Sequence, residues 1–533
     1  MPVLFIISTY ILKDSLGDYY LNLYDPAYVY LINSLNLAQI SGYGVGHIDH
    51  PGTPVQIIGA VILKIYYLNS NTSQNIVQDV FNRPEDYLSL INTCFIIINA
   101  CVLFVFGKLI FKFSKSLLTA IIIGFSPFVS NVILYGIIDV SPDNFLVLSS
   151  MLITLILFLY LFTEKYWYAD SIKIVLMYSI VCGFGISCKL NFFPILFIPL
   201  FLLNSFKSKI KLIFLITMFF LIFTLPALEN YQYFMRWIGN LFIHSDIYGK
   251  GSESIIDFPV FIENIGKIFF LNKFFGIIYL LSITTLIFNH IKLNKFISTV
   301  RSHKKIPEIK ILTAILISST IQIIIIAKHY HPYSQKYMIP VLMLSVTAIY
   351  LCIRIYKHYF KNLNLTQVYV ILIIFLSIIS ASQFYILNNE LIFQHSESVK
   401  IENYLMNNYS KNLIISDLES SDSEKALAFN IFYAGSQTDK YFEILSKNFN
   451  SNIFYSGWAD QFIYTSDSIS IKNEILKEEK IIIQNSKYSS IEKIIARLKE
   501  LSGTENIQVK KIFENNNGES ISEIMILKQD TLH

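Results

Sequence analysis

Long apolar runs separated by short polar segments dominate the first 388 residues. A helix needs about 20 mostly apolar residues to cross a bilayer. Ten runs are at or near that length: 88–110, 116–134, 144–163, 172–188, 190–204, 210–228, 274–290, 309–327, 337–355 and 367–386. A shorter run, 1–12, lacks the basic start and small-residue cleavage site of a signal peptide, so we interpret it as the end of a clipped first helix. The pattern predicts a polytopic α-helical membrane protein with about eleven spans.

Beyond Asn388 the pattern becomes that of a soluble domain. Apolar runs shorten and alternate with polar helical segments such as 490–501, where Ser489 or Ser490 could act as the helix cap. The short runs are 413–416, 481–484, 507–512 and 524–527. Since strands alternating with helices favour an α/β fold, we expect a small α/β domain over 389–533, after a membrane domain over 1–388.

Composition supports a membrane protein. Hydrophobic residues make up 53% of the 533 residues and charged residues 15%, with a mean hydropathy of +0.51. A soluble protein has roughly a quarter of its residues charged. A free cytosolic enzyme, a disordered chain and a coiled coil are therefore excluded, and the partners expected are membrane lipids and not nucleic acid. The five cysteines lie in or beside apolar runs, so no disulfide framework is indicated.

Loop charge orients the spans. Lys and Arg concentrate on the inner side of membrane proteins, and the basic turn 108–115 falls inside only if the apolar segment 54–68 does not span. We therefore expect 54–68 to lie along the outer surface, within a first outer loop over 13–87. The domain over 389–533 then also lies outside.

Polar and aromatic residues gather in the predicted outer loops. The relevant segments are Asp25-Pro26-Ala27-Tyr28, His47-Ile48-Asp49-His50-Pro51-Gly52, Asp139-Val140-Ser141-Pro142-Asp143 and Lys328-His329-Tyr330-His331-Pro332-Tyr333-Ser334-Gln335-Lys336-Tyr337.

The order and shared outer placement of these motifs resemble the GT-C glycosyltransferases, especially the branch of protein O-mannosyltransferases and aminoarabinose transferases. The matching positions are Asp25-Pro-Ala-Tyr28, His50-Pro-Gly and Asp143 at the start of a span. The resemblance covers roughly residues 14–350. The family often has Glu where this chain has Pro26, and a second Pro where it has Gly52.

The resemblance implies a membrane enzyme that moves a sugar from a polyprenyl-phosphate-linked donor to a hydroxyl of a glycan, lipid or protein acceptor. It also implies a bacterial inner membrane, with the active site facing the periplasm. The need for a cofactor stays open.

Asp25 is the first candidate for the catalytic base. A lipid-linked phosphosugar already has a good leaving group, so the reaction mainly needs a base for the acceptor hydroxyl, worth about 10²–10⁴-fold in rate. A carboxylate opposite the departing phosphate implies direct, inverting displacement. The alternative is that Asp25 only caps a helix whose first residue is Pro26.

Asp143 is the second catalytic candidate, as an acceptor or metal contact, because an acid at a membrane edge is costly. The alternative is a first-turn carboxylate that meets the helix dipole. Asp139 is a weaker candidate.

Other residues are candidates for binding substrate. Tyr28, His47, Asp49 and His50 come from the first loop, and the last three could instead shape that loop or hold a divalent ion. His331, Lys336 and Tyr337 could clamp the donor phosphate, with Arg236 as a further candidate. The alternative for the lysines is snorkelling from helix ends.

Two other functions compete. A transporter or flippase would place charges along a central path and often has repeated halves, whereas this chain has few acids within its spans and no repeat. A scaffold that only presents the soluble domain gives no reason for the outer carboxylates and histidines.

Overall fold

The structure is a computed structural model that describes most of the chain. The described residues are 1–22, 24–39, 44–70, 72–162, 170–245, 251, 253–254, 256–297, 307–410, 412–417, 422–448, 453–456, 461–464, 480–486, 490–503 and 506–526.

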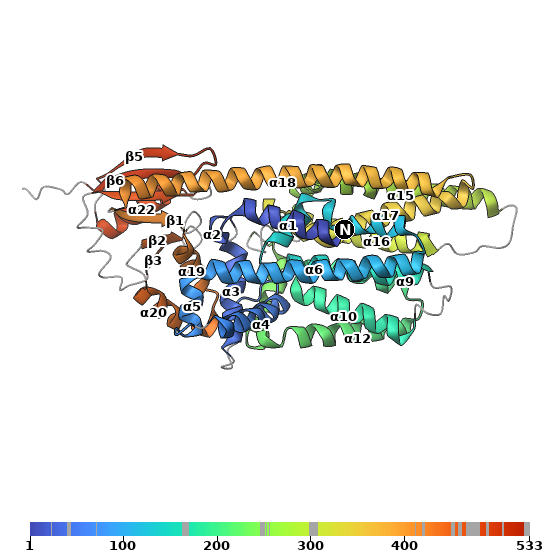
Figure 1. The fold of residues 1–533 in the computed structure, drawn as a ribbon, viewed down its shortest axis with the longest axis horizontal. Coiled ribbons are helices and arrows are strands. Elements are labelled where there is room, and N and C mark those ends of the chain that lie inside the picture. The colour runs from blue at the N-terminus through green and yellow to red at the C-terminus, as the bar shows by residue number, and fades with distance from the viewer. Residues whose placement is uncertain are drawn as a thin grey trace, which may run out of the picture. The chain divides into compact units, whose positions relative to one another are not determined.

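The chain forms two compact units (Figure 1). The first consists of Met1–Tyr10, Ile48–Val55 and Asn92–Leu387, and the second of Ile11–His47, Gln56–Ile91 and Asn388–His533. The second unit thus combines most of the predicted first outer loop with the predicted soluble domain.

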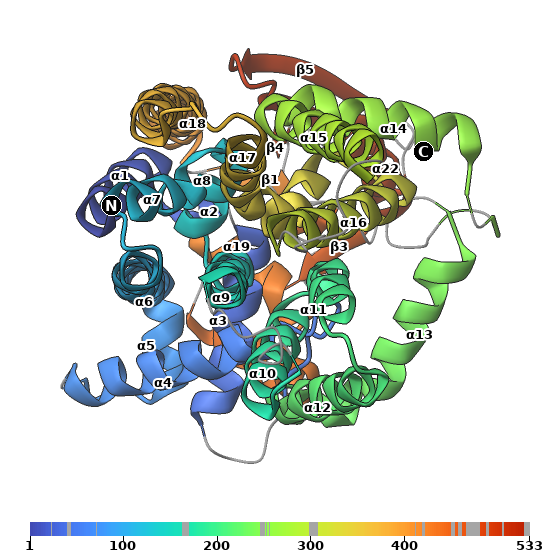
Figure 2. The same ribbon diagram turned by 90° about the vertical axis from the view of Figure 1, so that its right-hand side faces the viewer.

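The first unit is a bundle of apolar helices, several of which are seen end-on in Figure 2. They are α6 (Pro84–Ser114), α7 (Leu117–Gly124), α8 (Asn131–Ile138), α9 (Asp143–Phe162), α10 (Ile172–Cys188), α11 (Phe197–Leu202), α12 (Phe206–Phe223), α13 (Tyr231–Ile243), α14 (Phe258–Leu271), α15 (Lys273–Ile297), α16 (Pro307–Lys328), α17 (Ile339–Tyr359) and α18 (Leu365–Tyr409). Short 3-10 turns lie at η1 (Ser126–Phe128), η3 (Leu190–Leu196), η4 (Leu225–Asn230) and η6 (Pro332–Met338). Helices α6 and α18 begin or end in the second unit.

Six helices in the described part of the chain are long and apolar enough to cross a membrane, and two bent pairs bring the number to as many as eight. The shorter apolar segments Ile172–Cys188 and Leu190–Leu202 accompany them. The fold is therefore that of a polytopic helical membrane protein, while the number of eleven spans stays a prediction.

Two of the predicted runs do not form single straight helices. The run 116–134 bends by 70° between α7 and α8, and the helix over 210–228 ends at Phe223, where the chain bends by 89° toward α13. Both breaks contain a proline, Pro127 in η1 and Pro226 in η4. Proline removes a backbone donor and clashes with the preceding turn, which hydropathy alone does not register.

Helix α17 is the centre of the bundle. Among the 18 most apolar consecutive residues of the segment Ser334–Tyr359, which contains α17, 89% are buried within the chain itself. The corresponding share for α18 is 22%. Helix α17 packs against α9, α15 and α16. Because η6 leads directly into α17, the polar residues of η6 lie at the start of this buried helix.

The second unit contains the helices of the first loop. They are α1 (Pro2–Leu16), which begins in the first unit, α2 (Tyr19–Asn22), α3 (Tyr24–Ala38), α4 (Thr53–Asn69) and α5 (Ile76–Asn82). Segment 54–68 is thus a helix, and its position along the membrane surface stays a prediction. The soluble part adds α19 (Ser423–Ile431), η8 (Gly435–Gln437), α20 (Thr438–Asn448) and α22 (Ile491–Ser502).

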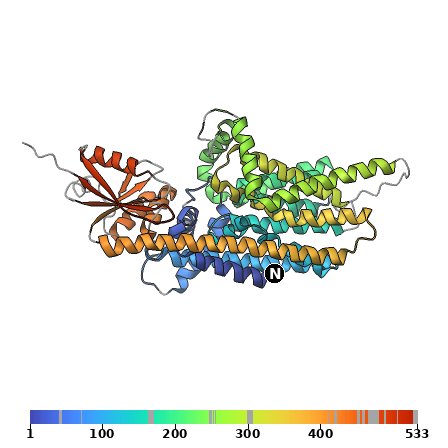
Figure 3. The ribbon, with the colours of Figure 1, turned by 90° about the horizontal axis from the view of Figure 1, so that it is seen from above.

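A six-stranded sheet forms the core of this soluble part (Figure 3). Its strands are β1 (Leu413–Asp417), β2 (Ile453–Ser456), β3 (Gln461–Tyr464), β4 (Ile481–Asn485), β5 (Ile507–Glu514) and β6 (Ser520–Ile526), in the order β3-β2-β1-β4-β6-β5. Strand β1 pairs in parallel with β2 and β4, and the other pairs are antiparallel.

Alternation along the strands explains why the sheet is covered on both faces. Ile481 and Ile483 pack with Ile494 and Leu498 of α22, while Ile482 packs with the end of α18. Side chains of a strand point alternately to opposite faces, so the apolar run buries both. The α/β fold and four of its strands are confirmed, and β2 and β3 are additional.

Candidate active site

Four charged residues of the first unit, three of them buried and one half-buried, come together at the ends of its helices. Asp139 follows α8, Asp143 opens α9, Lys189 follows α10 and Lys336 lies in η6. We call these four residues the charged cluster. Asp139 is fully buried, Asp143 is 1% exposed and Lys189 is 6% exposed. Charges are rarely buried unless they are paired.

The turn between α8 and α9 brings its two carboxylates inward. Pro142 precedes the first turn of α9, and a Cβ on Gly136 would lie only 3.0 Å from the Asp143 Cβ, so the glycine permits this close approach. The side-chain amide of Asn144 donates to the Asp139 carbonyl at 2.6 Å, and that of Asn92 donates to the same carbonyl at 3.1 Å. The turn is therefore fixed by buried hydrogen bonds.

Each carboxylate has one lysine partner. Lys189 Nζ lies 2.8 Å from Asp143 Oδ1, and Lys336 Nζ lies 3.3 Å from Asp139 Oδ2. The four charges sum to zero. Lys189 also sits at the carboxyl end of α10, where the helix dipole favours a cation.

The second oxygen of each carboxylate is not contacted by its lysine partner. Asp139 Oδ1 and Asp143 Oδ2 are buried and have no hydrogen-bond partner among the described residues. A buried acceptor without a donor costs about 1–3 kcal/mol, more for a charged group. Burial raises the pKa of the Asp139 carboxyl to about 6, despite the opposing charge of Lys336. The cluster thus presents two acceptors that a ligand with hydroxyl or N–H donors would satisfy.

Aromatic residues line the lysines. Lys189 Nζ lies 4.8 Å from the centre of the Tyr337 ring, and Lys336 Nζ lies 4.7 Å from that of Tyr135. The Tyr337 hydroxyl lies 3.4 Å from His50 Nε2, whose ring also contacts the edge of Trp237. The structure therefore brings predicted site residues His50, Lys336, Tyr337 and Asp143 into one connected set of contacts.

Backbone contacts hold Tyr337 in place. The side-chain amides of Asn191 and Gln322 both donate to its carbonyl, at 2.9 and 2.8 Å. Tyr337 is thus fixed by two neighbouring elements, η3 and α16.

The first unit also contains the predicted residues Arg236, His331 and Asp49. Arg236 is exposed on α13 and makes no hydrogen bond or ion pair within the described part of the chain. His331 exchanges backbone and hydroxyl hydrogen bonds with Ser334. Lys328 donates to the Leu241 and Phe242 carbonyls at the end of α13, at 2.6 and 2.8 Å, which makes it a helix cap. Asp49 is half-buried.

Three predicted residues belong to the second unit. Asp25 is exposed, with extended backbone angles (φ −115°, ψ 114°) that interrupt α3. Tyr28 is buried and donates to Glu85 at 2.6 Å; burial raises the pKa of its hydroxyl well above its usual value. The His47 ring packs edge-on against Tyr30 and Tyr433. Their roles in substrate binding and catalysis stay predictions.

The sequence analysis did not single out Lys189, and it gave Asp139 less weight than Asp143. Lys189 is a lone cation between two apolar runs, at a turn that the predicted topology places outside. A single charge that interrupts some thirty apolar residues was the available signal. The ranking of Asp143 above Asp139 has no counterpart in the contacts, because both are buried and paired.

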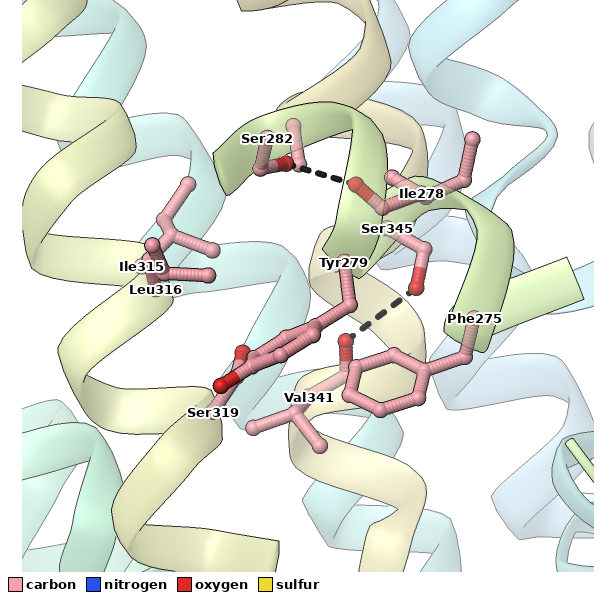
Figure 4. Close-up of a pocket in the computed structure, with 10 residues that line it drawn as sticks. Phe275, Ile278, Tyr279, Ser282, Ile315, Leu316, Ser319, Val341 and Ser345 are labelled. Atoms are coloured by element: carbon pink, nitrogen blue, oxygen red, sulfur yellow. Dashed lines mark hydrogen bonds between the residues drawn. The ribbon is translucent and has the colours of Figure 1, made fainter. Parts of the chain in front are cut away.

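A metal site and an internal cavity are two further features on which a function could depend. No group of three His, Cys, Asp or Glu side chains in the described residues has the arrangement of a metal site. A small cavity between α15, α16 and α17 is lined by Tyr279, Ser282 and Ser345 and has room for about one water molecule (Figure 4). It is too small for a sugar.

The fold and the charged cluster define a polytopic helical membrane protein with buried ionisable residues at its helix ends and a small α/β domain. No family model and no curated protein sequence matches the chain.

Two solved structures similar to it are both of ArnT from Cupriavidus metallidurans. The structure bound to undecaprenyl phosphate has 10% identity and a TM-score of 0.46, and the apo structure has 11% identity and a TM-score of 0.48. Each likeness covers 98% of this chain and 97% of the other. ArnT is an aminoarabinose transferase, from the branch that the loop motifs resemble.

Proposed function

We propose that the protein is an inverting membrane glycosyltransferase. It transfers a sugar from a polyprenyl-phosphate-linked donor to an acceptor hydroxyl of a glycan, lipid or protein, on the periplasmic face of a bacterial inner membrane. The observation that carries the proposal is the pair of buried carboxylates, Asp139 and Asp143, each held by a lysine and each with one oxygen that lacks a donor.

The charged cluster has groups that can bind both the sugar and the phosphate of such a donor. A sugar ring offers several hydroxyl donors to the free oxygens of Asp139 and Asp143. An ammonium group has three N–H donors, of which the carboxylate takes one. Lys189 and Lys336 therefore keep donors for the phosphate, where charge-assisted hydrogen bonds are strong.

The base is assigned to Asp25, on the sequence argument. Its carboxylate takes the proton of the acceptor hydroxyl while that oxygen attacks the anomeric carbon. The bond from that carbon to the phosphate oxygen breaks, and the lysines stabilise the departing polyprenyl phosphate. His47, Asp49, His50, Tyr28, His331, Tyr337 and Arg236 remain proposed substrate contacts.

Lipid analysis of a deletion strain tests the proposal. Loss of a transferase should cause a lipid-linked sugar to accumulate in the outer leaflet, where a reagent that does not cross the membrane, such as periodate, destroys it in intact spheroplasts. Wild-type protein should remove the accumulated lipid, and Asp143→Asn should not. Asp257→Asn is the matched control, because Asp257 is an exposed cap of α14 and asparagine caps as well.

The opposite results would reject the proposal. Accumulation of a sugar lipid that periodate cannot reach would indicate a flippase. No change in lipid-linked sugars would remove both functions.

A further inference from the structure

Asn33 joins three parts of the second unit that are far apart in the sequence. It lies in α3, the helix that begins with Asp25, and its side chain is fully buried. Its amide contacts both the His47 segment and the soluble domain. Sequence reasoning gave no role to this residue.

The side-chain amide of Asn33 makes four hydrogen bonds. Its oxygen accepts from the backbone N–H groups of Gly46 and His47, at 2.7 and 3.2 Å. Its nitrogen donates to the carbonyls of Val29 and Tyr433, at 2.8 and 3.1 Å. An asparagine side chain has two acceptor positions and two N–H donors, so all four are satisfied. Aspartate lacks both donors.

The next turn of α3 repeats the connection. Asn36 is 1% exposed, donates to the Ala434 carbonyl at 2.8 Å and accepts from the Tyr441 hydroxyl at 2.7 Å. Residues 33 and 36 are three apart and so share one face of the helix. That face packs against α19 and the turn that follows it.

Gly46 and Gly435 bring two backbones into direct contact. A Cβ on Gly46 would lie 2.3 Å from the Gly435 nitrogen and 2.4 Å from the Tyr433 carbonyl oxygen. Gly435 has φ +62°, a conformation that favours glycine. The Tyr433 ring then rests against the ring of His47, with centres 5.6 Å apart.

We propose that Asn33 is a positioning residue through which the soluble domain sets the geometry of Asp25 and His47. The domain is then a working part of the transferase and not an appended module. The inference rests on the proposed function for the roles of Asp25 and His47. The junction itself rests on the hydrogen bonds of Asn33 and Asn36.

Hydrogen exchange of the full-length protein in nanodiscs tests the junction without any substrate. Asn33→Ala removes the acceptor for two backbone N–H groups, so exchange of the peptide covering 44–50 should accelerate about tenfold or more. Asn33→Asp keeps that acceptor but loses both donors, so exchange of this peptide should accelerate less than in Asn33→Ala. Asn408→Ala is the control, because Asn408 is exposed and binds only a carbonyl of its own helix. Unchanged exchange in Asn33→Ala overturns the proposal.

Transfer kinetics test the positioning role. The donor probe is the lipid that accumulates in the deletion strain, added in graded amounts to membranes that contain each variant. In both Asn33→Ala and Asn33→Asp, the rate at saturating lipid should fall roughly ten- to a hundredfold, with little change in KM. Gly46→Ala should act like Asn33→Ala, because its Cβ must separate the two backbones. A raised KM with an unchanged maximal rate, or wild-type kinetics in Asn33→Asp, overturns the proposal.

Misfolding and failure of the proposed function give separate outcomes. If Asn33→Ala and Gly46→Ala are both absent from membranes while Asn408→Ala is present, the junction serves folding and the positioning role is rejected. If wild-type membranes consume none of the lipid, the proposed function fails. The exchange comparison still decides whether Asn33 joins the two segments.

Discussion

The ammonium nitrogen of Lys189 lies 2.8 Å from a carboxylate oxygen of Asp143, and both side chains are buried. Taking two charges out of water is expensive, so such a pair stabilises a protein little. Removing one partner, however, leaves the other as an uncompensated buried charge, at a cost of about 3–5 kcal/mol.

Lys189→Met should therefore lower the free energy of unfolding by about that amount, and Lys189→Met with Asp143→Asn should recover most of the loss. Thermal unfolding in detergent, at one pH for all variants, measures the difference. An equal loss in the single and double variants would show that the two charges do not depend on each other.

Asp25→Asn should abolish sugar transfer while membrane accumulation and donor binding stay close to wild type. Asparagine keeps the size and capping capacity of aspartate but cannot accept the acceptor's proton. Transfer in membranes and binding of the extracted lipid measure the two effects. Near-normal transfer would exclude Asp25 as the base and shift attention to Asp18 or Asp49, two other carboxylates of the predicted first outer loop.

Lys336→Ala should raise the donor KM about ten- to a hundredfold, since a charge-assisted hydrogen bond is worth about 1.5–3 kcal/mol. Lys336→Arg should rescue only in part, because the charge persists in a different geometry. Titration of donor against both variants measures this. Full rescue by arginine with an unchanged KM in Lys336→Ala would indicate snorkelling, and an unchanged KM after adding His331→Ala would move the phosphate site toward Arg236.

Transfer should fall as the pH drops below about 6. Burial raises the pKa of Asp139 to about 6, so the carboxylate gains a proton there and its ion pair with Lys336 is lost. Stability should change in the opposite direction. The folded state holds this proton more tightly than the unfolded chain between pH about 4 and 6, so this group's contribution to stability falls as pH rises through that window.

A pH profile of the transfer rate, repeated with Asp139→Asn, measures the effect. The variant should lack the inflection near pH 6, whatever its absolute rate. The same inflection in both proteins would assign it to another group.

A reporter fused near Asn75 should register as periplasmic, because the basic loops alternate only if 54–68 stays outside. A cytoplasmic signal would place the His47–Pro54 motif and Asp143 on opposite sides of the membrane. Paired enzymatic reporters, one active on each side, measure the orientation at that position.

Sequence patterns predict the apolar helices and the α/β part well, because both follow from hydrophobic periodicity. They fail where a proline breaks a run, as at Pro127 and Pro226, since hydropathy is unchanged there. They point to Asp143 and Lys336 of the charged cluster but not to Lys189, whose ion-pair partner is 46 positions away in the sequence. The role of Asn33 could not be predicted from the sequence for a similar reason. Its four hydrogen bonds join segments up to 400 positions apart.

The interleaved second unit has a consequence for synthesis. Residues 11–47 and 56–91 leave the ribosome well before the segment that begins at Asn388 and completes their unit. Helix α3 ends at Ala38 and α19 begins at Ser423, so at roughly 5–20 residues per second α3 waits about 20–80 s for α19 to be made. During that interval Asn33 and Asn36 lack their carbonyl partners, so the unit closes only after the intervening helices have been made.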